Sequence, residues 1–121
     1  MIGMLDEETD FNDFLNQVRK KFKANGIRYT KPHKEKVKKI ALCGGSGSFL
    51  LKDAINQNAD VFISADFKYH QFFEAEGKIV ILDIGHYETE QYTPELLQEL
   101  LSEKIPNFVT HLSGTNTNPI I

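Results

Sequence analysis

One stretch near the middle of the chain decides the fold class: Val37-Lys-Lys-Ile-Ala-Leu-Cys43, followed by Gly44-Gly-Ser-Gly-Ser48. The first run is rich in residues that favour strands, and the glycine-rich run closes it. Phe49–Asn56 then predicts a helix. The stretch therefore predicts a strand, a tight turn and a helix, which is the repeating unit of α/β proteins.

The same unit recurs toward the C-terminus. Two further predicted strands, Asp60–Ala65 and Ile79–Ile84, each precede a predicted helix, and the second strand is nearly all apolar, as in a strand covered on both faces. The two helices span about Phe67–Glu76 and Tyr87–Lys104, and Phe108–Leu112 is the last predicted strand. This alternation predicts an α/β domain with a largely parallel sheet and flanking helices.

The N-terminal part of the sequence predicts a strand, a helix and another strand. Met1–Leu5 is apolar and is expected to end a strand or a turn. Asp10–Lys23 has apolar residues every three or four positions, which predicts an amphipathic helix. Thr9 or Asp10 is its expected N-cap and Asn25-Gly26 its expected stop. Ile27–Thr30 predicts a short strand.

Composition excludes several classes of protein. The chain has 121 residues, the size of a single domain, and 14 Lys and Arg against 17 Asp and Glu give a net charge of −3. Nucleic-acid binding through phosphates usually needs an excess of basic residues. The apolar runs are strand-sized, no secretion leader opens the sequence, and Cys43 is the single cysteine. A cytoplasmic protein with no membrane or nucleic-acid partner is therefore expected.

The glycine-rich turn allows two interpretations. Ligands gather at the carboxyl ends of parallel strands, and glycines let a backbone approach an anion closely. However, Gly44–Ser48 matches neither the Walker pattern nor the full dinucleotide-binding pattern. The alternative is a tight turn in which Ser46 or Ser48 caps the next helix.

His86 and Glu90 follow the third predicted strand and are four residues apart. On a helical turn both side chains lie on one face and can bind one cation, with zinc, manganese or iron(II) favoured by imidazole plus carboxylate. Alternatively, the two residues only cap a helix start, because two ligands are too few for a metal site. Thr93-Pro94 is an alternative helix start, which would leave residues 86–90 on a separate turn.

Asp66 and His70 form a second acid–histidine pair with the same spacing. Adjacent strand ends are expected to bring both pairs toward one cleft. As a lone pair, Asp66 and His70 would instead be a surface N-cap and a half-buried histidine. His33 and His111 are expected to be structural.

Four motifs in this order resemble the C-terminal half of the NIF-three-like family, whose members are often named GTP cyclohydrolase I type 2. The resemblance covers nearly the whole chain. Its landmarks are Leu42-Cys-Gly-Gly-Ser-Gly-Ser48, Ser64-Ala-Asp-Phe-Lys-Tyr-His70, Asp83-Ile-Gly-His-Tyr-Glu-Thr-Glu90 and Thr115-Asn-Thr-Asn-Pro119.

The resemblance implies a three-layer fold, a dinuclear metal centre and a hexameric ring. Two divalent ions (zinc, manganese or iron) would be held by His86 and Glu90 together with an N-terminal His-His pair and an Asp that have no counterpart here. Residues 1–121 are thus expected to be one α/β domain, a fragment of a longer protein. Asp66 and His70 would orient ligands or transfer protons. A small anionic or nucleotide-like ligand would contact Gly44, Gly45, Ser46, Gly47, Thr115 and Asn116.

Three functions remain open from the sequence. The first is part of a metal-dependent hydrolase that resembles GTP cyclohydrolase or acts on a nucleotide or phosphoester, inactive as an isolated fragment. The second is a non-catalytic, metal-binding ring scaffold, metallochaperone or interaction module. The third, a nucleotide-binding domain without metal, is disfavoured by His86 and Glu90. Apolar surface uncovered in a fragment also predicts self-association.

Overall fold

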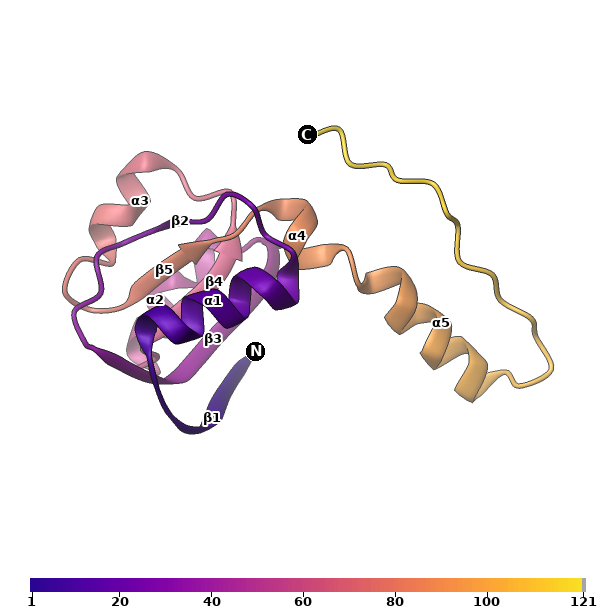
Figure 1. The fold of residues 1–121 in the computed structure, drawn as a ribbon, viewed down its shortest axis with the longest axis horizontal. Coiled ribbons are helices and arrows are strands. Elements are labelled where there is room, and N and C mark those ends of the chain that lie inside the picture. Colours follow the sequence, from indigo (N-terminus) through magenta and orange to yellow (C-terminus); the bar gives the residue numbers. More distant parts are fainter. Residues whose placement is uncertain (121) are drawn as a thin grey trace. The chain divides into compact units, whose positions relative to one another are not determined.

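The computed structural model describes residues 1–120 of the chain. It divides into two compact units, Met1–Thr89 and Glu90–Ile121, each of which is described by itself. Figure 1 labels the helices and strands of both units. None of the helices within residues 1–120 combines the length and the apolar composition that a membrane crossing requires.

The first unit is built on a mixed five-stranded sheet in the order β1-β3-β4-β5-β2. The three central strands β3, β4 and β5 are parallel, and β1 and β2 pair antiparallel at the two edges. The predicted α/β class is therefore confirmed. The strands span Ile2–Asp10 (β1), Arg28–Tyr29 (β2), Lys36–Ser46 (β3), Val61–Ala65 (β4) and Val80–Asp83 (β5).

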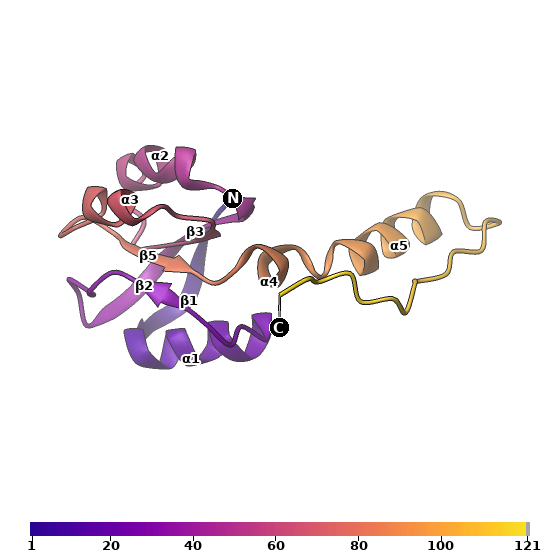
Figure 2. The ribbon, with the colours of Figure 1, turned by 90° about the horizontal axis from the view of Figure 1, so that it is seen from above.

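Helices cover both faces of this sheet and make three layers (Figure 2). Helix α1 (Phe11–Phe22) lies on one face; α2 (Leu51–Asn56) and α3 (Tyr69–Glu74) lie on the other. A short 3₁₀ turn, Ser48–Leu50, precedes α2. The layer of α2 and α3 follows from the connections β3-α2-β4 and β4-α3-β5 between parallel neighbours, and α1 covers the other face with its apolar stripe.

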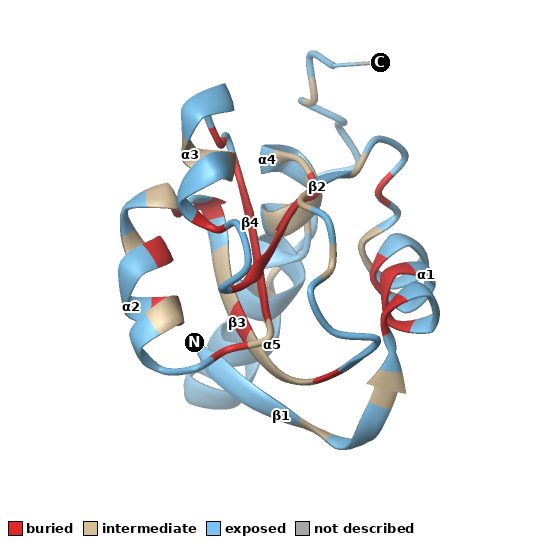
Figure 3. Cartoon of the chain, turned by 90° about the vertical axis from the view of Figure 1, so that its left-hand side faces the viewer, coloured by how far each residue is buried: buried red, intermediate tan, exposed pale blue. Residues whose placement is uncertain are grey.

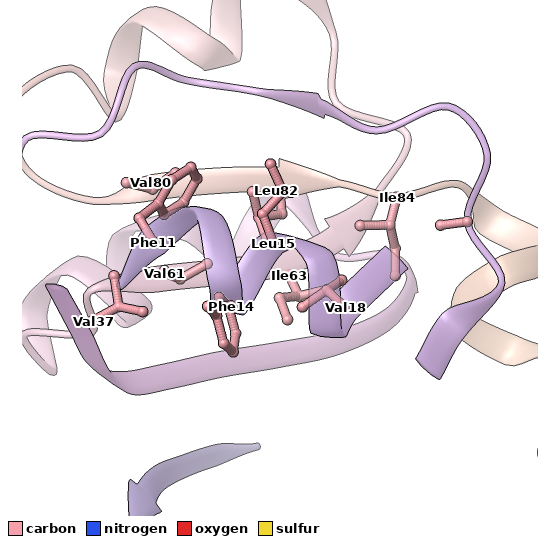
Figure 4. Packing of buried hydrophobic residues seen from close by; sticks show 11 residues of the cluster. Phe11, Phe14, Leu15, Val18, Val37, Val61, Ile63, Val80, Leu82 and Ile84 are labelled. Carbon is pink, nitrogen blue, oxygen red and sulfur yellow. The ribbon is translucent and has the colours of Figure 1, made fainter. Parts of the chain in front are cut away.

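Strands β4 and β5 are buried on both faces (Figure 3). Val61 and Ile63 of β4 face the cluster that α1 covers, whereas Phe62 faces the cluster under α2 and α3. This alternation is the two-residue period of a strand. Figure 4 shows α1 packing its apolar stripe onto β3, β4 and β5 through Phe11, Phe14, Leu15 and Val18.

The start of α1 is as predicted and its end is not. The Asp10 carboxylate caps the helix by accepting hydrogen bonds from the backbone N–H groups of Asn12 (2.8 Å) and Asp13 (3.3 Å). The helix ends at Phe22, and Lys23 adopts a left-handed conformation with φ +51°. The predicted stop at Asn25-Gly26 is therefore wrong, because the non-glycine residue Lys23 takes the position that glycine usually occupies.

Asp60 joins the N-terminal ends of β3 and β4. One carboxylate oxygen binds the Lys34 ammonium (2.6 Å), and the other accepts the backbone N–H groups of Lys38 and Lys39 (2.9 Å each). Burial alone would raise the pKa of Asp60, but the hydrogen bonds from Lys34, Lys39 and Lys38 together lower it below 3.8.

The stretch predicted as one helix from Tyr87 to Lys104 is two helices. They are α4 (His86–Glu90), which crosses the boundary between the units, and α5 (Thr93–Lys104). The alternative start at Thr93-Pro94 is the correct one, because proline fits the first turn of a helix.

The predicted strand Phe108–Leu112 is wrong. These residues are not in a strand, and Phe108 and Val109 are exposed. The Phe108 N–H instead closes a turn by donating to the Ile105 carbonyl oxygen (2.9 Å). β-branched and aromatic residues favour a strand only where a neighbouring strand accepts its hydrogen bonds. Within residues 1–120, the second unit contains no strand to pair with.

Candidate functional site

His86 is positioned by the tight turn that ends β5. Gly85 has φ +100°, a conformation that side-chain-bearing residues rarely adopt. A Cβ at Gly85 would lie 2.1 Å from a carboxylate oxygen of Glu88, but that oxygen is the far end of a flexible side chain and can move aside, so it is the backbone conformation that requires glycine. The turn places His86 as the first residue of α4, three positions after Asp83, the buried last residue of β5.

Asp66 is brought to His86 from the neighbouring strand. It follows β4 directly, and β4 and β5 are parallel neighbours, so their carboxyl ends lie side by side. Oδ2 of Asp66 lies 2.6 Å from Nδ1 of His86, and both side chains are about half exposed (47% and 50%). The two residues singled out on separate segments of the sequence thus form one hydrogen-bonded pair.

This pair has the arrangement of a histidine prepared to bind a metal. A carboxylate that accepts the Nδ1–H proton favours the imidazole tautomer that carries its lone pair on Nε2. Metal-binding histidines usually carry such a carboxylate on their second nitrogen, which orients the ring and raises its basicity. The Asp66–His86 geometry is therefore compatible with coordination through Nε2.

His70 takes a different position from the one expected for an acid–histidine pair. It lies in α3, is exposed, and packs its ring edge-to-face against Tyr69 with 5.5 Å between the ring centroids. Among the described residues, Asp66 is hydrogen-bonded to His86 rather than to His70.

Glu90 is the last residue of α4, four positions after His86. Residues 1–120 contain no group of three or more His, Cys, Asp or Glu side chains placed to hold a metal ion. The assignment of His86 and Glu90 as two ligands of one site stays a prediction, and it requires further ligands from outside these residues.

The glycine-rich segment is integrated into the sheet. Gly44, Gly45 and Ser46 extend β3, and Ser46 pairs with Ala65. The N–H of Gly45 donates to Thr89 Oγ1 (2.7 Å), and its carbonyl oxygen accepts the Ser64 hydroxyl (2.9 Å). The peptide groups of Gly45 are thus used to hold β3, β4 and α4 together.

The expected capping by Ser46 or Ser48 is wrong. The 3₁₀ turn starts after Gly47 and has no side-chain cap, and the Ser48 hydroxyl accepts the Gln71 side-chain amide (3.0 Å). A Cβ at Gly47 would lie 2.4 Å from Ser64 Oγ and 2.7 Å from Cys43 Cβ. Close packing therefore explains this glycine without a ligand.

Thr89 was not singled out by the sequence. Its hydroxyl donates to the His86 carbonyl oxygen (2.7 Å) while it accepts the Gly45 N–H. The hydroxyl therefore joins the glycine-rich segment to the first turn of α4. A threonine three residues after a histidine is common, so only the fold reveals this role.

Thr115 and Asn116 lie in the C-terminal segment of the second unit. The Thr115 N–H donates to Ser113 Oγ (3.3 Å), and Asn116 Oδ1 accepts the N–H of Asn118 (2.9 Å). These local hydrogen bonds shape the segment itself; its role as a ligand contact stays a prediction.

Comparisons with known proteins agree on one family. The family described as Duf34/NIF3 (NGG1p interacting factor 3) matches residues 1–119. A protein of Staphylococcus epidermidis named GTP cyclohydrolase 1 type 2 homolog is 36% identical over 124 aligned positions, which cover 98% of this chain and 34% of the relative. The chain thus spans about one third of the length of that relative.

Solved structures show the same fold. A Staphylococcus aureus protein matches with a TM-score of 0.82 at 27% identity, over 99% of this chain and 40% of its own. A Bacillus cereus protein related to NIF3 matches with a TM-score of 0.79 at 31% identity, over 99% of this chain and 34% of its own.

Proposed function

The chain belongs to the Duf34/NIF3 family, and from this premise we propose that it supplies His86 and Glu90 to the divalent-metal site of a metal-dependent hydrolase. The contact between Asp66 Oδ2 and His86 Nδ1 carries the proposal. A purely solubilising histidine at a helix start has no need of a carboxylate that fixes its tautomer. A metal ligand does, because the ring must present Nε2 in one orientation.

The donor set decides which ions fit. An imidazole nitrogen and a carboxylate oxygen suit zinc, manganese or iron(II). Such an ion, when bound, activates water and polarises a substrate oxygen at neutral pH. In this proposal Asp66 orients the His86 ring and holds the Nδ1 proton, and Glu90 supplies negative charge and an oxygen ligand.

The proposed substrate is a nucleotide or a related phosphorylated small molecule. The support is the name of the S. epidermidis relative, GTP cyclohydrolase 1 type 2 homolog, together with the position of His86 and Asp66 at the carboxyl ends of parallel strands, where α/β proteins bind ligands. Because the chain spans about a third of that relative, the reaction would also need residues from the remaining two thirds.

Site-specific metal binding tests the ligand assignment on this chain. Substoichiometric Mn²⁺ broadens nearby NMR signals even when binding is weak, so it can detect a site with two protein ligands. We expect broadening centred on residues 86–90 that disappears in the His86→Ala/Glu90→Ala variant and persists in His33→Ala. Unchanged broadening in the double variant, or broadening centred on the acidic segment 6–8, would contradict the assignment.

Catalysis is tested separately, in a protein of the relatives' length that carries this sequence. We expect metal-dependent turnover of at least one compound in a nucleotide panel headed by GTP, and its loss in the double variant. Metal binding without turnover across the panel would instead favour a ring scaffold or metallochaperone.

A further inference from the structure

Asp66 has an unusual backbone conformation for a residue with a side chain. Its φ is +60°, in the left-handed region. Aspartate tolerates this region better than most residues, but the conformation still costs free energy that the surroundings must offset. With this backbone conformation, the Asp66 carboxylate reaches from the end of β4 to Nδ1 of His86 in α4 (2.6 Å).

The residues on both sides of Asp66 are fixed. Ala65 ends β4, is fully buried, and pairs with Ser46 of β3. Phe67 is also buried and packs edge-to-face on Phe62, with 5.8 Å between the ring centroids. The backbone positions on both sides of Asp66 are therefore fixed, by the sheet at Ala65 and by the core at Phe67.

An ion pair holds the backbone of Phe67. Oδ2 of Asp83 accepts the N–H of Phe67 (3.1 Å) and also binds Nη2 of Arg28. The same Arg28 nitrogen donates to the carbonyl oxygen of Phe67 (3.0 Å). Both polar groups of the Phe67 backbone are thus tied to one Arg28–Asp83 pair.

The pair itself is held by the sheet. Arg28 lies opposite Asp83 in the antiparallel pairing of β2 with β5, and the Asp83 side chain is only 5% exposed. The Arg28 guanidinium also lies 5.4 Å from the centroid of the Phe72 ring. Three chain segments, β2, β5 and the loop after β4, therefore meet at this ion pair.

We propose that Arg28 and Asp83 are positioning residues. By holding Phe67 they keep Asp66 in its left-handed conformation, and Asp66 in turn holds His86 as the Nδ1–H tautomer. The link to metal coordination rests on the proposed function, whereas the effect on the His86 tautomer is a property of this chain alone. A purely stabilising ion pair would affect unfolding and leave the tautomer of the folded protein unchanged.

The test measures the His86 tautomer by the ¹⁵N shifts of its ring nitrogens in the full chain without metal. The spectra are recorded at an alkaline pH at which the ring shifts of His86 no longer change with pH, so that only the two neutral tautomers are compared. We expect the Nδ1–H form to dominate in the wild type. In Arg28→Met, the ratio of the Nδ1–H form to the Nε2–H form should fall at least about tenfold. The reason is that Asp66 then no longer holds the hydrogen bond from Nδ1–H of His86 to its charged carboxylate.

Three further variants support this measurement. Asp66→Ala gives the tautomer ratio of His86 without its carboxylate partner. Lys31→Met removes a nearby positive charge from a residue that does not bind Asp83, and should keep the wild-type ratio. Arg28→Lys keeps the charge but lacks the guanidinium fork, so it should give an intermediate ratio and serves if Arg28→Met does not fold.

A folded Arg28→Met or Arg28→Lys protein with the wild-type tautomer ratio would overturn the proposal. The two proposals can also fail independently. A wild-type chain that shows the Nδ1–H tautomer but no Mn²⁺ broadening at residues 86–90 refutes the metal assignment and leaves the positioning role supported.

Discussion

Replacing Gly47 with alanine should be among the most damaging single-methyl additions in the first unit. The new Cβ would lie 2.4 Å from Ser64 Oγ, 2.7 Å from Cys43 Cβ and 2.9 Å from Cys43 Sγ. Overpacking of this kind costs about 1–3 kcal/mol. Displacing the Ser64 hydroxyl also breaks its hydrogen bond to Gly45, which adds about 1 kcal/mol. The expected loss of unfolding free energy is therefore about 2–4 kcal/mol.

Urea unfolding followed by far-UV circular dichroism measures this loss. Gly3→Ala is the matched control, because nothing lies within 4 Å of its Cβ position, and it should be close to neutral. In a Ser64→Ala background the cost of Gly47→Ala should fall by about 1 kcal/mol or more, because the nearest clashing atom is gone. If Gly47→Ala is as mild as Gly3→Ala, close packing does not explain this glycine.

Three further substitutions test the account of the fold. Asp60→Asn should destabilise the chain by about 1.5–3 kcal/mol at pH 7. Folding lowers the pKa of Asp60 below 3.8, so the difference in unfolding free energy between the wild type and Asp60→Asn should be largest above that pH and vanish as the pH falls through the folded-state pKa. A difference that does not change with pH would refute the role of Asp60 as a charged acceptor. Asp10→Ala removes the α1 cap and should cost about 1 kcal/mol in urea unfolding, so an unchanged midpoint would count against the cap. Leu82→Ala, at a fully buried position, should cost about 2–5 kcal/mol, and a loss below 1 kcal/mol would be too small for the packing described.

Local sequence signals were enough for the parallel core, and the order of the strands predicted that Asp66 and His86 lie near one another. The apolar runs at β4 and β5 and the periodic stripe of α1 are short-range patterns, and each predicted its element. The approach of Asp66 to His86 followed from a rule of topology, because carboxyl ends of neighbouring parallel strands lie together.

The remaining features depend on contacts between distant segments. Glycine has a weak preference for strands, yet Gly44–Ser46 continues β3. It does so because β4 and Thr89 form hydrogen bonds with its backbone. Phe108–Leu112 has the composition of a strand but no strand beside it in its unit. The pairing of Arg28 with Asp83 joins positions 55 residues apart and leaves no local pattern.

The metal content of a protein of the relatives' length that carries this sequence tests the central claim most directly. Elemental analysis of the purified wild type should find close to two divalent ions per chain, as in two-metal hydrolytic sites. The His86→Ala/Glu90→Ala variant should lose them, and His33→Ala should keep them. A wild type without metal, or a double variant that retains the wild-type content, would contradict the assignment of His86 and Glu90 as metal ligands.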